Sequence, residues 1–265
     1  MAERLDSYLV SSGLAGSRER AKNMIKNGLV TVNGSSSVKP SMPITDNDTV
    51  TAGEDLKYVG RGALKLKKAF EIFPISVKGA VCADIGASTG GFTEIMLENG
   101  ASKVYAVDVG HDQLDEKLCR DSRVVNMEGT NVRDLTPSHL GESIAFMSVD
   151  LSFISLTNVS GVMCSLLAED GEAVILIKPQ FEAGKSAVGK NGIVKDQKDH
   201  IRVLESLIAH FSSLGMGLQG LTYSPVTGGS GNIEYLAYLK KGAAASAVID
   251  LKELVKTSFS QLREK

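Results

Sequence analysis

Three charged side chains stand at the ends of predicted strands, where the side chains of an α/β sheet can meet. Asp150 follows the apolar run Phe146-Met-Ser-Val149, and Lys178 follows Val174-Ile-Leu-Ile177. Glu234 opens a later predicted strand. In an open α/β sheet the ligand crevice lies beyond the carboxyl ends of the parallel strands, so Asp150 and Lys178 should meet there. A single lysine after an apolar strand is usually a strand terminator, but two charged groups near a glycine-rich turn favour a site.

The glycine-rich turn is Ala83-Asp-Ile-Gly-Ala-Ser-Thr-Gly-Gly-Phe92, which lies between an apolar strand and a helix-forming segment. Asp84 ends the strand. The turn contains Gly86, Gly90 and Gly91. Such a strand, turn and helix lets the backbone approach a cofactor closely. The spacing D-x-G-x-x-x-G-G fits S-adenosylmethionine (SAM) better than a dinucleotide. The next strand ends in Asp108, an acid placed to take the hydroxyls of a cofactor ribose. An ordinary tight turn is the alternative interpretation.

Composition sets limits on the compartment and on metal binding. Of the 265 residues, 43% are hydrophobic, which is enough for a buried core, yet no apolar run reaches the ~18 residues of a membrane span. The N-terminus is charged and lacks the apolar segment of a signal peptide. The cysteines Cys82, Cys119 and Cys164 have neither disulfide nor metal-site spacing. We therefore expect a cytoplasmic protein without a metal or a membrane segment.

Positive charge is concentrated in two segments of a chain whose net charge is −2. Residues 1–40 carry six basic and three acidic side chains, and residues 57–68 carry five basic side chains and no acid. Locally clustered positive charge favours phosphate binding more than the total charge does. A solvated helix face explains the same pattern equally well.

The hydrophobic periodicity predicts an α/β sheet of mostly parallel strands after residue 80, preceded by a small α+β domain. We expect strands near 81–85, 103–108, 123–127, 144–149 and 173–177. We expect helices near 91–99, 112–119, 154–168 and 197–213. A hairpin of strands near 217–224 and 233–239 should end the sheet with an antiparallel strand, and a helix from Ser246 to Arg263 should follow. The expected domains are residues 1–56 and 57–265.

The first 50 residues carry a recognisable pattern of helices, turn and strands. Helices are predicted at 4–10 and 18–27, and strands at 29–32 and 49–51. The segments Arg4-Leu-Asp, Ser17-Arg18 and Gly28-x-Val-x-Val-Asn-Gly34 resemble the S-four domain, an RNA-binding domain named after a small-subunit ribosomal protein. In that family the second helix and adjoining residues contact RNA phosphates, which give affinity without base specificity. The RNA-binding residues expected from this pattern and from the second basic segment are Arg4, Arg18, Arg20, Lys22, Lys26 and Arg61.

Motifs along nearly the whole chain resemble the TlyA (haemolysin A) family. They include Arg61-Gly-Ala-Leu-Lys-Leu, the glycine-rich turn, Asp108-Val-Gly, Thr130-Asn-Val-Arg133, Asp150-Leu-Ser-Phe153, Lys178-Pro-Gln-Phe-Glu182 and Gly231-Asn-Ile-Glu234. Members of this family join an S-four domain to an FtsJ-like SAM-dependent methyltransferase with a Rossmann-like sheet. They methylate the ribose 2′-hydroxyl of cytidine in ribosomal RNA (rRNA), so the resemblance implies that activity and rRNA or ribosomal subunits as partners.

The resemblance also implies site residues. The family's Lys-Asp-Lys-Glu tetrad falls on Lys65, Asp150, Lys178 and Glu234. A helix is also predicted from Arg61 onward, with Ala63, Leu66, Phe70 and Phe73 on one apolar stripe. Lys65 lies off that stripe, where a lysine is usually exposed, so the resemblance alone singles it out. Lys178 is expected to be the general base or the donor that orients the 2′-oxygen. The expected cofactor-binding residues are Asp84, Gly86, Ser88, Thr89, Gly90, Gly91, Phe92, Asp108 and Asn131, the last at the adenine edge.

Three other functions compete with this interpretation. A NAD-dependent oxidoreductase is disfavoured by the glycine spacing and by the lack of an obvious hydride-transfer constellation. A membrane-active haemolysin, which the family's historical name suggests, has no supporting membrane segment or basic amphipathic stretch. An RNA-binding protein without catalysis is disfavoured by the intact tetrad. The sequence does not indicate which nucleotide is modified or the oligomeric state.

Overall fold

The computed structural model describes residues 2–26, 28–35, 38–52, 58–228 and 231–263, without the side chains of residues 19, 23, 26 and 263. The chain divides into two compact units, Met1–Arg61 and Gly62–Lys265, called here the N-terminal and C-terminal units. The domain boundary expected between residues 56 and 57 falls within 53–57, outside the described residues.

The N-terminal unit packs two helices against short antiparallel strands. The helices α1 (Leu5–Ser11) and α2 (Arg18–Lys26) lie where the periodicity predicted them. The strands are β1 (Glu3–Arg4), β2 (Val30–Val32), β3 (Pro43–Ile44) and β4 (Val50–Ala52). β2 pairs with β4 and β1 pairs with β3. The sequence did not predict β1 and β3, because a strand of two residues is too short to show alternation.

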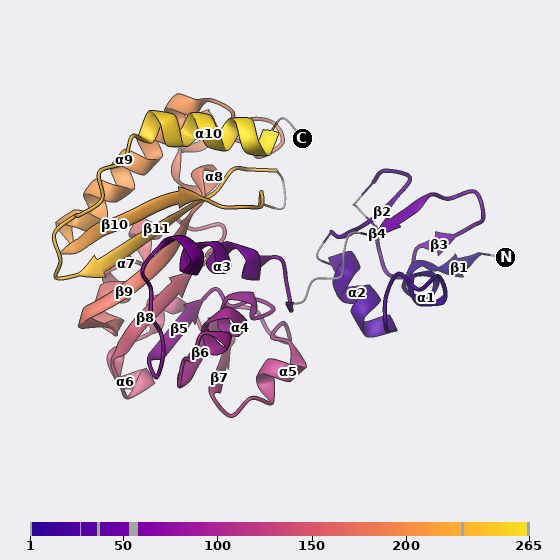
Figure 1. The fold of residues 1–265 in the computed structure, drawn as a ribbon, viewed down its shortest axis with the longest axis horizontal. Coiled ribbons are helices and arrows are strands. Elements are labelled where there is room, and N and C mark those ends of the chain that lie inside the picture. Colours follow the sequence, from indigo (N-terminus) through magenta and orange to yellow (C-terminus); the bar gives the residue numbers. More distant parts are fainter. Residues whose placement is uncertain (1, 27, 36–37, 53–57, 229–230, 264–265) are drawn as a thin grey trace. The chain divides into compact units, whose positions relative to one another are not determined.

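The C-terminal unit is built on a seven-stranded sheet in the order β10-β11-β9-β8-β5-β6-β7 (Figure 1). The strands are β5 (Val81–Ile85), β6 (Lys103–Asp108), β7 (Val124–Glu128), β8 (Ile144–Val149), β9 (Leu167–Ile177), β10 (Met216–Tyr223) and β11 (Tyr235–Lys241). β5 to β9 pair in parallel, whereas β11 runs antiparallel to both of its neighbours. The expected fold class, a mostly parallel sheet with an antiparallel final strand, is therefore confirmed.

Helices cover both faces of the sheet, because each strand sends alternate side chains to opposite faces. Ala83 and Ile85 of β5 join the core formed with α7 (Ser160–Leu166), α9 (Gln197–Ser213) and α10 (Leu251–Arg263). The other face is covered by α3 (Gly62–Ile72) and α4 (Gly91–Glu98). Ring contacts hold α3 there, with Phe70 on Phe146 and Phe73 on Tyr238.

The register brings several strand ends to one edge of the sheet. Ile85 pairs with Val107 and with Val149, so β5, β6 and β8 end side by side. Tyr235 pairs antiparallel with Ile177, which places the residue before β11 beside the residue after β9. This edge is where the charged residues predicted at strand ends must lie.

Three expected helices differ in their bounds from the observed ones, and in two of them a carboxylate that binds backbone N–H groups explains the difference. Of 112–119, only α5 (Glu116–Cys119) is helical, since the Glu128 carboxylate accepts from the backbone N–H groups of Gln113 and Leu114. The segment 154–168 contains a short 3₁₀ turn and α7, and β9 already begins at its end. The last helix begins at Leu251 rather than Ser246, because Asp250 caps it by accepting from two backbone N–H groups. The short helices α6 (Pro137–Leu140) and α8 (Pro179–Glu182) complete this unit.

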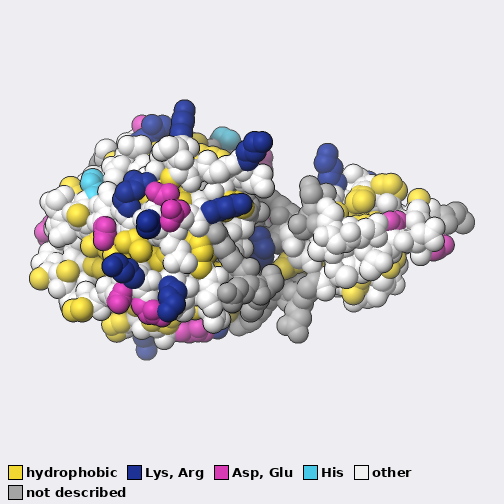
Figure 2. All heavy atoms as spheres, turned by 90° about the horizontal axis from the view of Figure 1, so that it is seen from above, with side chains coloured by type: hydrophobic (Ala, Val, Ile, Leu, Met, Phe, Trp, Pro, Cys, Tyr) yellow, Lys and Arg dark blue, Asp and Glu magenta, His cyan; other side chains and the backbone are white. Residues whose placement is uncertain are grey.

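Charge on the C-terminal unit is mixed on the face seen in Figure 2, where basic and acidic side chains lie beside one another. No helix in the described ranges is long and apolar enough to cross a membrane.

Candidate active site at the carboxyl edge of the sheet

The glycine-rich turn connects β5 to α4 and is shaped by close backbone packing. Gly86 has φ +85°, and a Cβ there would clash with the backbone carbonyl of Asp150. Ser88 also adopts a positive φ of 47°. Its N–H donates to Asp108 Oδ2 at 2.8 Å, while the N–H of Gly110 donates to Oδ1 at 2.8 Å. Asp108 therefore ties the turn to the end of β6.

Asp84 is fully buried beneath this turn, and both of its carboxylate oxygens accept hydrogen bonds from other residues of the protein. Its Oδ2 accepts from both the N–H and the hydroxyl of Thr93 at 2.8 Å, and its Oδ1 accepts from the Ser148 hydroxyl at 3.0 Å. Burial raises the pKa of Asp84 to about 7, although these hydrogen bonds oppose the rise. Asp84 thus joins β5, β8 and the first turn of α4.

A cavity of about 330 Å³ lies beside Asp108 and is called here the Asp108 cavity. Its walls combine apolar side chains with two carboxylates, Asp108 and Asp150. The lining includes Ile85, Val107, Asp108, Val109, Thr130 and Val132. An apolar slot with a carboxylate suits a flat ring joined to a sugar, because the slot holds the ring and the carboxylate accepts from hydroxyls.

The structure places the predicted cofactor residues in two groups. Gly86, Ser88 and Asp108 line the Asp108 cavity, whereas Thr89, Gly90, Gly91 and Phe92 are not part of its described lining. Gly90 instead packs against Leu118, which leaves no room for a Cβ. The side chain of Asn131 caps a 3₁₀ turn, since its Oδ1 accepts from the N–H of Arg133 at 3.0 Å.

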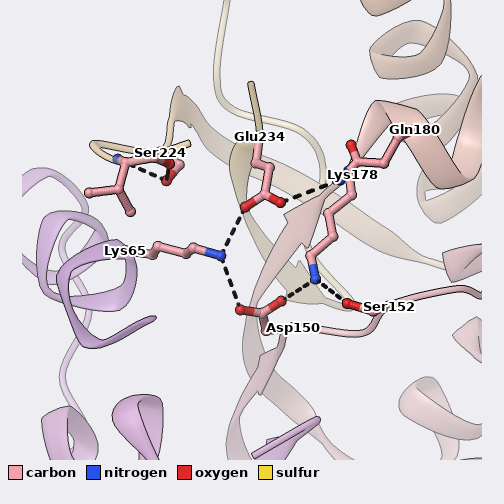
Figure 3. A network of polar contacts seen from close by, with 8 residues as sticks. Lys65, Asp150, Ser152, Lys178, Gln180, Ser224 and Glu234 are labelled. Carbon is pink, nitrogen blue, oxygen red and sulfur yellow. Dashed lines mark hydrogen bonds and ion pairs between the residues drawn. The ribbon is translucent and has the colours of Figure 1, made fainter. Parts of the chain in front are cut away.

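The predicted tetrad comes together from four separate segments (Figure 3). Lys65 projects from α3, Asp150 and Lys178 follow β8 and β9, and Glu234 precedes β11. Lys65 Nζ lies 2.8 Å from Glu234 Oε2 and 3.3 Å from Asp150 Oδ2, and Lys178 Nζ lies 2.6 Å from Asp150 Oδ1. The charges therefore alternate along a chain of ion pairs, and the four side chains are only 3% to 19% exposed.

Burial and charge act in opposite directions within this chain of ion pairs. Burial alone would lower the pKa of Lys65, but the carboxylates of Asp150 and Glu234 outweigh it and hold that pKa above its usual value. Burial likewise favours neutral Asp150, yet Lys65 and Lys178 hold the pKa of Asp150 below its usual value. The ion pairs thus favour the charged forms of both Lys65 and Asp150.

That open space is a cleft of about 510 Å³, called here the lysine cleft, which all four tetrad residues line. It shares part of its wall with the Asp108 cavity. The shared lining consists of Gly86, Ser88, Asp150, Ser152 and Phe153. A molecule in one cavity would therefore lie next to a molecule in the other, as a group transfer requires.

Several residues of the lysine cleft had no role in the sequence interpretation. The Lys178 ammonium donates to Ser152 Oγ at 2.8 Å, and Phe153, 92% exposed with φ 64°, packs its ring on Phe181. Gly228 approaches Glu234 so closely that a Cβ would strike the carboxylate. Ser152 and Phe153 belong to the motif Asp150-Leu-Ser-Phe153, and Phe181 belongs to Lys178-Pro-Gln-Phe-Glu182. These are two of the motifs that carry the family resemblance, so the sequence did contain a signal for them.

In the N-terminal unit, the buried Asp6 gathers two of the predicted RNA-binding arginines. Arg4 Nε donates to Asp6 Oδ1 at 3.0 Å and Arg18 donates to Asp6 Oδ2 at 3.3 Å, while both arginines stay half exposed. The hydrogen bond from Arg4, together with Arg18, lowers the pKa of Asp6 to about 2. Arg20 and Lys22 are exposed and Arg61 is partly buried, whereas the Lys26 side chain lies outside the described part.

Comparison with known proteins gives two family matches and close relatives. The model of the FtsJ-like methyltransferase family matches residues 58–241, and that of the S4 domain matches residues 3–50. The chain is 43% identical to the 16S/23S rRNA (cytidine-2′-O)-methyltransferase TlyA of Mycobacterium tuberculosis, covering 89% of each. It is also 43% identical to Hemolysin A of Brachyspira hyodysenteriae, covering 89% of this chain and 98% of the relative. A solved structure from Streptococcus thermophilus has a TM-score of 0.79 at 43% identity, covering 99% of this chain and 98% of that one.

Proposed function

Because this chain belongs to the TlyA family of FtsJ-like methyltransferases, we propose that it methylates the ribose 2′-hydroxyl of a cytidine in rRNA, using SAM. The observation that carries the proposal is the shared wall between the Asp108 cavity and the lysine cleft. Purified ribosomal subunits incubated with the protein and methyl-labelled SAM should gain label in their rRNA. Subunits that stay unlabelled under conditions where the protein binds SAM would contradict the proposal.

The donor set of the Asp108 cavity fits SAM. Each oxygen of Asp108 takes one backbone N–H and keeps further capacity to accept from the ribose hydroxyls. Val107, Val109 and Val132 offer apolar contact to the adenine ring. Asn131 is not part of the described lining, and its amide oxygen caps a 3₁₀ turn by accepting from the N–H of Arg133.

The tetrad supports the chemistry that this cofactor would bring. SAM supplies a methyl group activated by its sulfonium, so that the S–C bond breaks, an O–C bond forms and the 2′-hydroxyl loses its proton. Lys65 forms ion pairs with the carboxylates of Asp150 and Glu234. Asp150 also pairs with Lys178 and so positions it in the lysine cleft, where the substrate would bind. Lys178 either accepts the 2′-hydroxyl proton or, as an ammonium, donates to the 2′-oxygen while that proton passes to water, and both roles need the same placement. Placement of this kind is worth roughly 7–11 kcal/mol in the best cases.

The S4 domain supplies the second half of the proposal, which is binding to rRNA or ribosomal subunits. Asp6 holds Arg4 and Arg18 as a pair, and Arg20 and Lys22 add exposed positive charge. Guanidinium groups match phosphate oxygens in geometry as well as charge. We propose that these residues contact the RNA backbone, together with Lys26 and Arg61 from the sequence interpretation.

Replacing Asp108 with alanine should weaken SAM binding about tenfold to a hundredfold, as expected when hydrogen bonds to a charged acceptor are lost. Isothermal titration calorimetry measures the affinity, and circular dichroism checks that the variant is folded. Asp170→Ala is the matched control, because Asp170 is an exposed acid near the opposite end of β9. Equal affinity in wild type and folded Asp108→Ala would exclude Asp108 from the cofactor site.

Gly228→Ala should lower the rate of methyl transfer about tenfold to a hundredfold, because a small misplacement at a catalytic site is costly. The new Cβ would push the Glu234 carboxylate, the end of a flexible side chain, so the fold should persist while the ion pair with Lys65 changes. Thermal melting and single-turnover assays separate the two effects. Gly161→Ala in α7 is the control, since open space surrounds Gly161. A normal rate in Gly228→Ala would show that the site tolerates displacement of Glu234.

A further inference from the structure

The amino group of Lys178 has two hydrogen-bond acceptors, both supplied by the segment that follows β8. Its Nζ lies 2.6 Å from Asp150 Oδ1 and 2.8 Å from Ser152 Oγ (Figure 3). Within the described residues, Lys178 has no third hydrogen-bond or ion-pair partner. A tetrahedral nitrogen bonded to Cε has three remaining directions, so two are taken and one is left for a group in the lysine cleft, where the Phe181 ring centroid lies 5.9 Å from Nζ.

We propose that Ser152 is a positioning residue for the methyl transfer, since it and Asp150 together leave Lys178 one free direction toward the substrate; this rests on the proposed function. When Lys178 is an ammonium, the free direction carries an N–H that can donate to the 2′-oxygen. When Lys178 is a neutral amine that donates to both acceptors, the same direction carries the lone pair that can take the 2′-hydroxyl proton. Ser152 therefore serves either proton route.

The location of Ser152 supports this role. Ser152 lines both the lysine cleft and the Asp108 cavity, whereas the preceding Leu151 lines the Asp108 cavity. Asp150 and Ser152 both reach Lys178, while Leu151 between them lines the Asp108 cavity but not the lysine cleft. The hydroxyl of Ser152 is thus placed where the two cavities meet.

The segment that carries Ser152 is anchored to the segment that carries Lys178. Glu182, in the short helix α8 just after Lys178, accepts from the Ser155 hydroxyl at 2.7 Å and from the N–H of Leu156 at 2.8 Å. The bonds of Glu182 therefore join the segment after β8, which carries Ser152, to the segment after β9, which carries Lys178. This anchoring can fix the distance between Lys178 Nζ and Ser152 Oγ before the substrate binds.

The test compares Ser152→Ala with Ser152→Thr, which keeps the hydroxyl. Ser152→Ala should lower kcat about tenfold or more, the loss expected from one hydrogen bond to a charged group. The KM for ribosomal subunits and the SAM affinity should stay within about twofold of wild type. Ser152→Thr should recover most of the rate. Thr157→Ala is the control, because Thr157 is an exposed hydroxyl on the same segment that bonds to Ser155.

A double-mutant cycle with Lys178→Ala, measured in single-turnover reactions, makes the test specific. Ser152→Ala should cause no further loss once Lys178 is absent. Three results would overturn the inference. The first is an equal loss of rate from Ser152→Ala with and without Lys178, and the second is a change confined to KM or SAM affinity. The third is a folded Ser152→Thr variant as slow as Ser152→Ala. A wild-type rate in Ser152→Ala overturns this inference alone, whereas a wild-type chain without methyl transfer overturns the proposed function as well.

Discussion

Replacing Lys178 with alanine is expected to lower the rate of methyl transfer to rRNA by about a hundredfold or more, the effect typical of a positioned acid or base. Lys178 is held by one carboxylate and one hydroxyl, those of Asp150 and Ser152, whereas Lys65 is held between two carboxylates, those of Asp150 and Glu234. SAM affinity should barely change, because Lys178 does not line the Asp108 cavity. Single-turnover rates and calorimetry measure the two quantities.

The matched control for this prediction is Lys67→Ala. Lys67 is an exposed lysine of α3 that pairs with Glu71 one helical turn away and lines neither cavity. Its loss should leave the rate within about twofold of wild type. A folded Lys178→Ala variant with near-normal turnover would remove Lys178 from the mechanism while leaving the reaction intact.

Removal of residues 1–61 is expected to abolish methylation of ribosomal subunits while SAM binding persists. The two cavities are lined by residues of the C-terminal unit, which has its own core. The removed unit carries Arg4 and Arg18, the arginine pair held by Asp6. Because phosphate contacts release counterions, the affinity of the full chain for RNA should also fall steeply as salt rises.

Filter binding over a range of salt concentrations and a methylation assay check this prediction together. Calorimetric SAM binding by the truncated chain shows whether its remaining unit is folded. A truncated chain that binds SAM and methylates subunits as fast as the intact chain would contradict a role for the N-terminal unit in RNA binding.

The part of the site that sequence could predict is the part that follows from strand ends. Asp150 and Lys178 each follow an apolar strand, and parallel strands bring such residues to one edge. Glu234 joins them because β11 runs in the opposite direction, so the start of β11 lies at that same edge. The positions of these three residues depend on the order and direction of the strands, which the alternation of strands and helices in the sequence already indicates.

Other features depend on contacts that periodicity does not contain. Lys65 lies off the apolar stripe of its helix and yet is buried, because its partners Asp150 and Glu234 come from distant segments. The expected helix at 112–119 is shortened because Glu128 binds the backbone of the preceding turn. Likewise, the bond between Lys178 and Ser152 exists only once two loops are placed side by side.

The most direct test of the whole account is the chemistry of the product. Ribosomal subunits methylated by the protein should be digested to nucleosides and analysed by liquid chromatography and mass spectrometry. The account predicts 2′-O-methylcytidine, together with a phosphodiester bond that resists alkaline hydrolysis because its neighbouring 2′-hydroxyl is blocked. A cytidine methylated on its base, with an alkali-sensitive bond, would contradict the assignment of the lysine cleft to a ribose hydroxyl.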